Sequence, residues 1–383
     1  MSKKKIMATM ATAALLAGCG GGDNSNDNNT SPPSQPGGNP PAEFGQSAAA
    51  ITGLVHCDDY SIAANTLNES DRAICQDGRR KSPTGDAVVL DIAAFDKDGN
   101  PLEITGFSED LGNSGAKIDK AYFLQSVRDL PSSVKGPYSV VLAFDQSGSI
   151  SNTDPNNTRL SAGSIFLQKN KSPDEMAIGF FQNQDTQYFK VNGGFFSTNP
   201  IADGLGGGLA ALKDRVGGST PLYDAVVHSA QLAKERGANE NKAVVVFSDG
   251  KDTSSRNTME AAIQSSVSRS VPVYTFALDG ADQDLPALQT IAVRTKGAFF
   301  YASSTKQLVS MYGSLGNVLR GGGRIYRTHW SLNITPQSTP NCFNEKPTAP
   351  GLYTCNVPGN IKITTKEGDI RLRVNYSFGF RVV

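Results

Sequence analysis

Short apolar stretches that alternate with helical segments constrain the fold of this 383-residue chain most strongly. Residues 138–144 and 243–247 are nearly continuous apolar runs, as expected of strands buried on both faces of a sheet. Residues 222–234 instead place small and apolar side chains on one helical stripe. The same reasoning predicts further strands and helices at residues 158–168, 176–181, 187–189, 257–269, 271–278, 285–294, 298–301 and 306–319. This alternation predicts an α/β fold with a doubly wound, mostly parallel sheet that helices cover on both faces.

Oxygen-bearing side chains follow the predicted strands at one edge of this sheet. Asp145, Ser147 and Ser149 come directly after the first long strand, and Asp249 follows the second. Thr220 lies between them, just before a predicted helix. Ligands in such folds bind beyond the carboxyl ends of the strands, so these five side chains are expected to converge there. A set made only of hard oxygen ligands favours Mg²⁺, with Mn²⁺ or Ca²⁺ as alternatives.

These motifs resemble the metal-ion-dependent adhesion site of von Willebrand factor type A (VWA) domains. That site consists of D-x-S-x-S, then a Thr and then an Asp, which Asp145, Ser147, Ser149, Thr220 and Asp249 match in order. The resemblance covers residues 136–321 and implies a Rossmann-like VWA fold. It also implies a divalent cation held by the five residues directly or through water. One coordination position would stay open for an Asp or Glu carboxylate of a protein partner.

Two other functions are alternatives for this site. The protein could serve as a scaffold or assembly factor for an envelope or secretion complex, which is also a binding function. A metal-activated hydrolase would need a general base beside the ion. The only candidate base is Asp252, since the remaining acids are expected to be ligands, and no G-x-S-x-G nucleophile motif is present. We therefore expect a binding protein and no enzyme.

The first residues resemble a bacterial lipoprotein signal peptide. Three lysines at residues 3–5 precede an apolar run at residues 6–17, which is too short to span a membrane but is typical of a signal-peptide core. The run ends in Leu-Ala-Gly-Cys, like a lipobox, which implies removal of residues 1–18 and lipidation of Cys19. Gly20 after the cysteine favours the outer membrane in the enterobacterial sorting pattern. The prediction is an envelope protein anchored by lipid, on either the periplasmic or the surface face.

A polar segment follows the predicted lipid anchor. Residues 19–42 are rich in Gly, Asn, Ser and Pro and contain almost nothing that could be buried. Such a composition predicts a disordered tether.

The remaining cysteines fit an exported protein. Cys57, Cys75, Cys342 and Cys355 allow three disulfide pairings, of which Cys57–Cys75 and Cys342–Cys355 close the shortest loops. A metal site is the alternative, but the chain has no C-x₂-C motif and only three scattered histidines. We expect disulfides.

The regions on either side of the central domain are expected to be rich in β-strands. The predicted divisions are an N-terminal β-rich region at residues 43–135, a VWA domain at 136–320 and a C-terminal β-rich region at 321–383. The two ends are expected to form an accessory β-sandwich-like unit together, since domain termini often lie close. Around residues 96–100 the sequence resembles part of a calcium loop but lacks the final Glu, so a hairpin turn between strands at 88–95 and 102–105 is expected.

Charge and hydropathy exclude two classes of protein. The chain has 36 basic and 36 acidic residues, so it has no excess of cations for coating nucleic acid. No apolar run reaches the roughly 18 residues that a membrane-spanning helix needs, which excludes a polytopic membrane protein.

Overall fold

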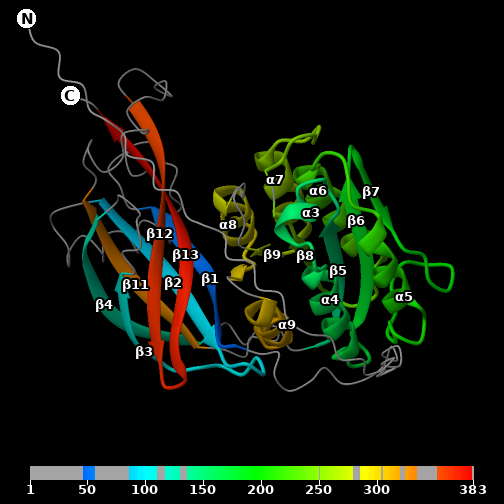
Figure 1. The fold of residues 1–383 in the computed structure, drawn as a ribbon, viewed down its shortest axis with the longest axis horizontal. Helices are drawn as coiled ribbons and strands as arrows, with labels where there is room; N and C mark the ends of the chain where they lie inside the picture. The colour runs from blue at the N-terminus through cyan, green and yellow to red at the C-terminus, as the bar shows by residue number, and fades with distance from the viewer. Residues whose placement is uncertain are drawn as a thin grey trace, which may run out of the picture. The chain divides into compact units, whose positions relative to one another are not determined.

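A computed structural model gives the fold of most of the chain (Figure 1). It describes residues 46–56, 86–109, 117–129, 136–249, 251–278, 285–302, 305–319, 324–333 and 352–381. The strands of these residues form a ten-stranded sheet and a three-stranded sheet. In the larger sheet the strand order is β4-β11-β2-β1-β10-β9-β8-β5-β6-β7.

The middle of the larger sheet is parallel, as the alternation of strands and helices predicts. Five neighbouring strands, from β10 to β6, run parallel, and β7 closes that edge antiparallel to β6. β5 is buried along its whole length, which explains its continuous apolar sequence. The strands are β5 (Tyr138–Asp145), β6 (Glu175–Gln182), β7 (Asp185–Tyr188), β8 (Asn241–Phe247), β9 (Val273–Leu278) and β10 (Phe299–Ala302).

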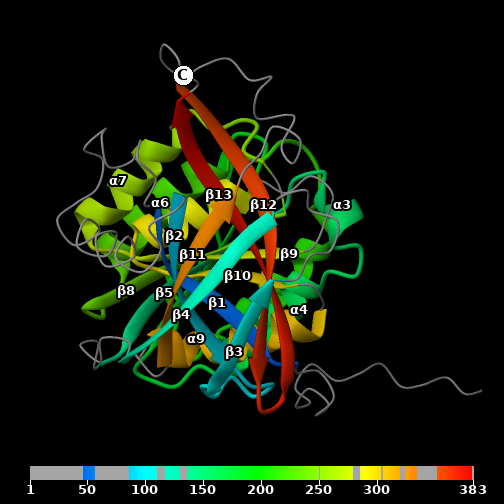
Figure 2. The ribbon, with the colours of Figure 1, turned by 90° about the vertical axis from the view of Figure 1, so that its left-hand side faces the viewer.

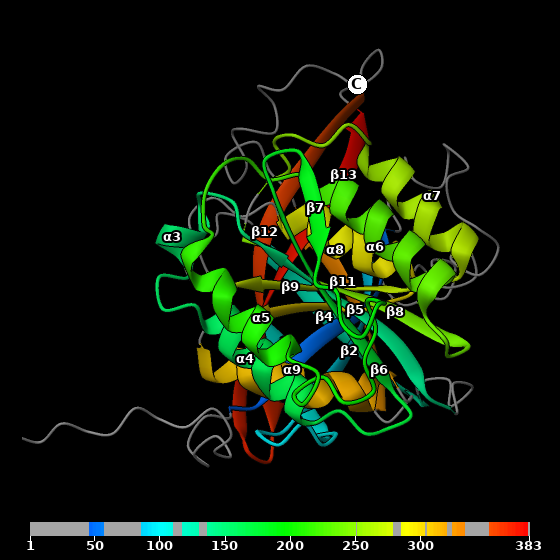
Figure 3. The same cartoon turned by 90° about the vertical axis from the view of Figure 1, so that its right-hand side faces the viewer.

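Helices cover both faces of the parallel strands (Figure 3). One face packs against α6 (Leu222–Arg236), α7 (Met259–Arg269) and α8 (Leu285–Arg294). The opposite face packs against α4 (Thr158–Gln168), α5 (Leu205–Ala210) and α9 (Thr305–Leu319). Three short elements were not predicted from the sequence, namely α3 (Ile150–Thr153), α5 and the 3₁₀ helix at Ala211–Asp214. The mostly parallel, doubly wound α/β fold is thus confirmed.

Strands from both ends of the chain extend the parallel sheet. β1 (Ala48–His56) pairs antiparallel with β10 and so covers what would otherwise be an edge strand. β2 (Asp86–Phe95), β11 (Arg324–Asn333) and β4 (Lys117–Asp129) continue the sheet, each antiparallel to its neighbour. Figure 2 shows these strands of the two chain ends side by side.

The second sheet also combines strands from the two ends. It contains β3 (Ile104–Glu109), β12 (Leu352–Thr365) and β13 (Gly368–Arg381), with β12 in the middle. Apolar residues of β12 and β13 share one buried cluster with α8 and with β1 and β2. This sheet therefore packs on the same face of the larger sheet as α8.

The predicted hairpin turn around residues 96–100 forms, but the strands on either side of it do not stay paired with each other. The tight turn forms, and Asp96 Oδ1 accepts hydrogen bonds from the N–H groups of Asp98 and Asn100, both at 2.8 Å. The strands on either side diverge after one bridge between Phe95 and Pro101. β3 pairs with β12 instead of β2 because partners from the distant end of the chain are available to both strands.

A ladder of four phenylalanine rings crosses the parallel strands just before they end. Phe144, Phe247, Phe276 and Phe300 occupy directly opposite positions on β5, β8, β9 and β10. Their successive ring centroids lie 5.0, 4.8 and 4.4 Å apart, and each pair is stacked. Because a slip of one residue would turn every side chain to the other face, the ladder fixes the register of the four strands. It therefore also fixes the height at which the residues after Phe144 and Phe247 leave the sheet.

Among the described residues, no helix combines the length and the apolar character that crossing a membrane requires.

The phenylalanine ladder makes a prediction about stability. Phe247→Leu keeps most of the apolar burial but loses two stacked ring pairs, each worth about 0.5–1.5 kcal/mol. Phe299→Leu is the matched control, because Phe299 is buried on the other face of the same sheet and belongs to no stacked pair of the described rings. In urea unfolding, Phe247→Leu should lower the free energy of unfolding by about 1–3 kcal/mol more than Phe299→Leu. Equal losses would show that stacking contributes nothing beyond burial.

Candidate functional site

Asp145 is the last residue of β5 and lies at the bottom of the candidate site. Its side chain is completely buried. Asp145 Oδ1 accepts a hydrogen bond from the Ser147 N–H at 2.8 Å, which closes a tight turn directly after the strand. Asp145 Oδ2 accepts from the Ser248 hydroxyl at 2.6 Å. The carboxylate is therefore held from two neighbouring strand ends, β5 and β8.

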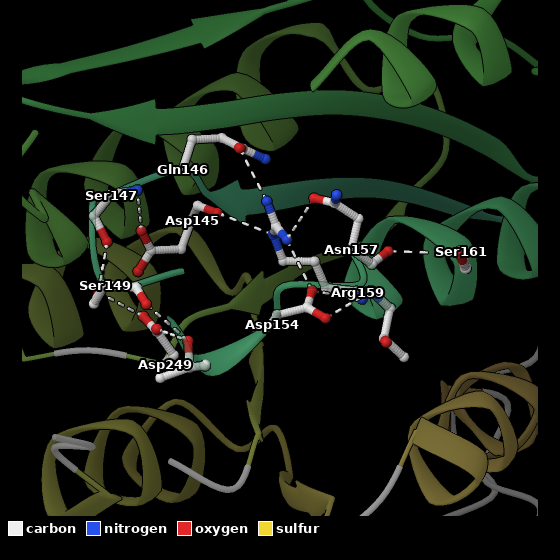
Figure 4. A network of polar contacts seen from close by, with 11 residues as sticks. Asp145, Gln146, Ser147, Ser149, Asp154, Asn157, Arg159, Ser161 and Asp249 are labelled. Carbon is white, nitrogen blue, oxygen red and sulfur yellow. Dashed lines mark hydrogen bonds and ion pairs between the residues drawn. The ribbon is translucent and has the colours of Figure 1, made fainter. Parts of the chain in front are cut away.

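Asp249 meets the serines of the first motif from the end of β8. The Ser147 and Ser149 hydroxyls lie 3.1 Å apart, and the Ser149 hydroxyl donates to Asp249 Oδ1 at 3.0 Å. The Thr153 hydroxyl of α3 donates to Asp249 Oδ2. Figure 4 shows Asp145, Ser147, Ser149 and Asp249 gathered in one cluster. Four of the five predicted side chains thus lie together.

The fifth predicted residue, Thr220, lies on a loop that is held against the first motif. The Gly148 N–H donates to the Gly218 carbonyl at 2.9 Å, and the Gly217 N–H donates to the Gln146 carbonyl at 2.8 Å. Gly218 has a positive φ of 78°, and a Cβ atom there would collide with Asn183, so glycine is required at this position of the loop. Thr220 is 4% exposed, and its hydroxyl makes no hydrogen bond with the residues that the structure describes.

Burial raises the pKa of both carboxyl groups of the site. It raises the pKa of Asp145 to about 6, and the nearby Asp249 carboxylate adds to this rise, whereas hydrogen bonds from Ser147 and Ser248 oppose it. Burial likewise raises the pKa of Asp249, against hydrogen bonds from Thr153 and Ser149. Two neighbouring carboxylates in a buried site disfavour the charged form of each other. A cation between them would reverse both effects.

A buried arginine supports the first motif from behind (Figure 4). Arg159 of α4 is only 1% exposed, and its Nε–H donates to the Asp145 carbonyl at 3.2 Å. Its Nη2 donates to Gln146 Oε1 at 3.0 Å, and its Nη1 donates to Asp154 Oδ2 at 2.8 Å. Asp154 also accepts from the N–H of Thr158, and thereby satisfies a free donor at the start of α4. The guanidinium group thus joins the end of β5 to the beginning of α4.

The cluster suits a hard cation in its donor chemistry. It offers carboxylate and hydroxyl oxygens only, which are the ligands that Mg²⁺ and Ca²⁺ prefer. No group of three or more His, Cys, Asp or Glu side chains comes together among the described residues. Any site here would therefore combine two carboxylates with hydroxyl groups, as the sequence motif does, and would leave an ion with residual positive charge.

The residues that hold the cluster in place were not predicted from the sequence. Ser248, Thr153 and Arg159 contact the predicted residues directly but belong to none of the sequence motifs. Asp154 carried a usable signal, since an acid shortly before a helical segment is a common cap. Asp252, considered as a base, accepts from the Ser255 N–H at 3.4 Å through Oδ2, while its buried Oδ1 has no hydrogen-bond partner among the described residues.

Several predicted modification sites lie outside the described residues. These include Cys19 with the predicted signal peptide and tether, and also Cys57, Cys75 and Cys342. Cys355 lies on β12 opposite Phe378, and its side chain is not described. The lipid anchor and the disulfides remain predictions.

One family model matches the central region of the chain. The family model of the von Willebrand factor type A domain matches residues 139–313, which include all five predicted site residues. A search of curated proteins gave no match.

The chain also matches solved structures, at low sequence identity and with TM-scores below 0.5. A von Willebrand factor type A protein from Catenulispora acidiphila is 11% identical, with 76% of this chain and 68% of that chain covered and a TM-score of 0.42. An aerotolerance-related membrane protein from Bacteroides fragilis is 15% identical, covering 48% and 98% of the two chains at a TM-score of 0.38. The pilus adhesin SpaC from Lactobacillus rhamnosus GG, in its open conformation, is 12% identical, covering 78% and 46% at a TM-score of 0.39.

Removing the buried arginine should destabilise the protein strongly. Arg159→Met leaves the Asp154 carboxylate buried without its cation, and breaking a buried ion pair in this way costs about 3–5 kcal/mol. Arg294→Met is the control, because it breaks an exposed pair with Glu260 that should contribute about 0–1 kcal/mol. Chemical denaturation measures both changes. A loss for Arg159→Met no larger than that for Arg294→Met would contradict this account of the buried pair.

Proposed function

We propose that this protein, whose residues 139–313 form a von Willebrand factor type A domain, binds a protein partner through a divalent cation. The observation that carries the proposal is the cluster of oxygen donors that Asp145, Ser147, Ser149 and Asp249 form at the ends of β5 and β8. With Thr220 on the adjacent loop, it contains every residue of the metal-ion-dependent adhesion site that the sequence resembles. Mg²⁺ is the expected ion, with Mn²⁺ or Ca²⁺ as alternatives.

The residues of the site would hold an ion and leave one side of it accessible to a partner. A bound cation supplies a positive centre to which a carboxylate oxygen of the partner can attach. Asp145 and Asp249 supply the negative charge, and Ser147, Ser149 and Thr220 supply neutral oxygens. Because only two carboxylates contribute, the ion would not be fully neutralised and would attract an Asp or Glu side chain.

Binding is favoured over catalysis by the way the acids are used. Asp145 and Asp249 would both be ligands, and a ligand cannot also act as a general base. Asp252 belongs to the loop after β8 and is hydrogen-bonded to Ser255 there. Among the described residues, no acid other than Asp145 and Asp249 forms a hydrogen bond within the cluster, and we therefore propose a binding protein and no enzyme.

The N-terminal sequence supports a proposal for the location of the protein. We propose that Cys19 carries the lipid anchor and that residues 20–42 connect it to the folded part. This would place the VWA domain in the bacterial envelope, most simply at the outer membrane, where it could act in adhesion or as a scaffold for an assembly.

Cation binding by the purified protein is the first test. Saturating Mg²⁺ should raise the unfolding temperature, since a ligand at 100 times its Kd stabilises by about 2.7 kcal/mol. Asp249→Asn should remove most of this stabilisation. Asp214→Asn, which neutralises an exposed acid of the 3₁₀ helix, should retain it. An unfolding temperature that does not respond to Mg²⁺, Mn²⁺ or Ca²⁺ would refute the cation site.

Capture of a partner is the second test. Immobilised protein should retain a specific partner from bacterial envelope extracts in Mg²⁺ but not with excess chelator, and mass spectrometry would identify it. Thr220→Ala should weaken this capture strongly while it lowers the unfolding temperature only slightly. The Thr220 hydroxyl would bind the ion, and it makes no hydrogen bond to other described residues. A peptide with an Asp should compete better than the same peptide with Asn. Equal capture with and without chelator would contradict the proposed mode of binding.

A further inference from the structure

The segment after Asp249 is bound to the loop and helix that follow Thr220. The Thr220 N–H donates to the Thr253 hydroxyl at 2.8 Å, and the Thr253 N–H donates to the Thr220 carbonyl at 2.9 Å. This reciprocal pair connects two parts of the site that are 33 residues apart in the sequence. The position of Thr220 relative to Asp249 therefore depends on how this segment is held.

Asp224 holds the segment from the first turn of α6. It is 4% exposed, and its Oδ2 accepts from the Arg256 N–H at 3.0 Å. Its Oδ1 accepts both from the N–H of Asn257 at 2.9 Å and from Asn257 Nδ2 at 2.7 Å. The N–H of Asp224 itself donates to the Ser255 hydroxyl at 3.0 Å. Four hydrogen bonds thus join one residue to three consecutive residues of the segment.

The carboxylate of Asp224 is directed at the neighbouring segment, away from its own helix. Acids in a first helical turn usually favour the N–H groups of that helix. No side chain caps the N-terminus of α6, whereas both oxygens of Asp224 accept from Arg256 and Asn257. Burial would raise the pKa of Asp224, but these hydrogen bonds lower it below its usual value, so the group is charged at neutral pH. Charged acceptors make the stronger hydrogen bonds.

We propose that Asp224 is a positioning residue for the cation site, which holds Thr220 in place relative to Asp249 through the segment 251–257. This role rests on the proposed function, since it concerns the affinity for the same ion. Asp224 itself would not bind the ion. Residues that orient metal ligands typically change metal affinity by about 10–100-fold when they are replaced.

Two simpler explanations make different predictions. If Asp224 only stabilises the fold, its replacement should lower the unfolding temperature and leave the affinity for the ion unchanged. If its negative charge only attracts the cation from a distance, uncharged partners such as Asn257 and Ser255 should have no influence on affinity. A positioning role alone predicts that both kinds of variant weaken binding.

The test measures Mn²⁺ affinity of the full-length protein by electron paramagnetic resonance at neutral pH. Asp224→Asn should raise the Kd roughly tenfold, because an amide nitrogen replaces one acceptor. Asn257→Ala and Ser255→Ala each remove one hydrogen bond without changing charge, and should raise the Kd by a smaller factor. The double variant Asp224→Asn/Asn257→Ala should bind about as weakly as Asp224→Asn alone, since both changes break the same contact. Hydrogen exchange at the Thr220 and Thr253 amides should become faster in Asp224→Asn.

Glu235→Gln is the matched control, because it removes one negative charge from the exposed last turn of the same helix. Its Kd should equal that of the wild-type protein. If the wild-type protein binds no Mn²⁺, both the proposed function and the role of Asp224 are refuted. If it binds Mn²⁺ and the Asp224→Asn, Asn257→Ala and Ser255→Ala variants bind equally well, only the role of Asp224 is refuted. A loss confined to Asp224→Asn would indicate a charge effect and would also overturn positioning. Asn257→Ala and Ser255→Ala keep the test decisive if Asp224→Asn fails to fold.

Discussion

The stacking of four phenylalanine rings across β5, β8, β9 and β10 is the interaction on which the rest of the structure depends. Hydrogen bonding alone does not specify the register of parallel strands, because a shift by two residues restores the same pattern of N–H and carbonyl groups. The rings of Phe144 and Phe247 lie directly opposite each other. The next residue of each chain segment, Asp145 and Ser248, therefore emerges at the same height, where the two form a 2.6 Å hydrogen bond. The site begins at the point where this apolar ladder ends.

Beyond the ladder, polar contacts replace apolar packing as the means of holding the loops. Each loop of the cluster is supported from another element: the first by Arg159 of α4, and the segment after Asp249 by Asp224 of α6. Both supporting side chains are charged, buried and hydrogen-bonded to backbone groups, as buried charges must be. Such loops keep their conformation without contributing to the apolar core. This explains how two acids with raised pKa values are kept close together instead of turning toward solvent.

The central fold was accessible from the sequence because its signals are local. Continuous apolar strands, helical stripes and the residues after each strand need only neighbouring positions to be recognised. Interactions between residues far apart in the chain could not be predicted from the sequence. The stack of Phe144 with Phe276 and Phe300 by way of Phe247 involves four separate strands. The pairing of the strands on either side of the turn at residues 96–100 was wrong for the same reason, since β3 follows β2 closely in the chain but pairs with β12, about 250 residues later. Arg159, too, reads as an ordinary helical residue until the fold places it behind Asp145.

The strand pairing also bears on how the site is connected to the rest of the protein. β10 ends the parallel sheet and carries the last ring of the ladder, Phe300, which lies opposite Ala50 of β1. β1 is one of the strands that the two chain ends contribute. Phe300 therefore takes part both in the phenylalanine ladder and in the pairing of β10 with β1. A displacement of β1 along β10 would have to break this register, and with it the stack that sets the height of Asp145. The extension of the sheet is therefore a structural support of the candidate site, although β10, β9 and β8 lie between β1 and the strand of Asp145.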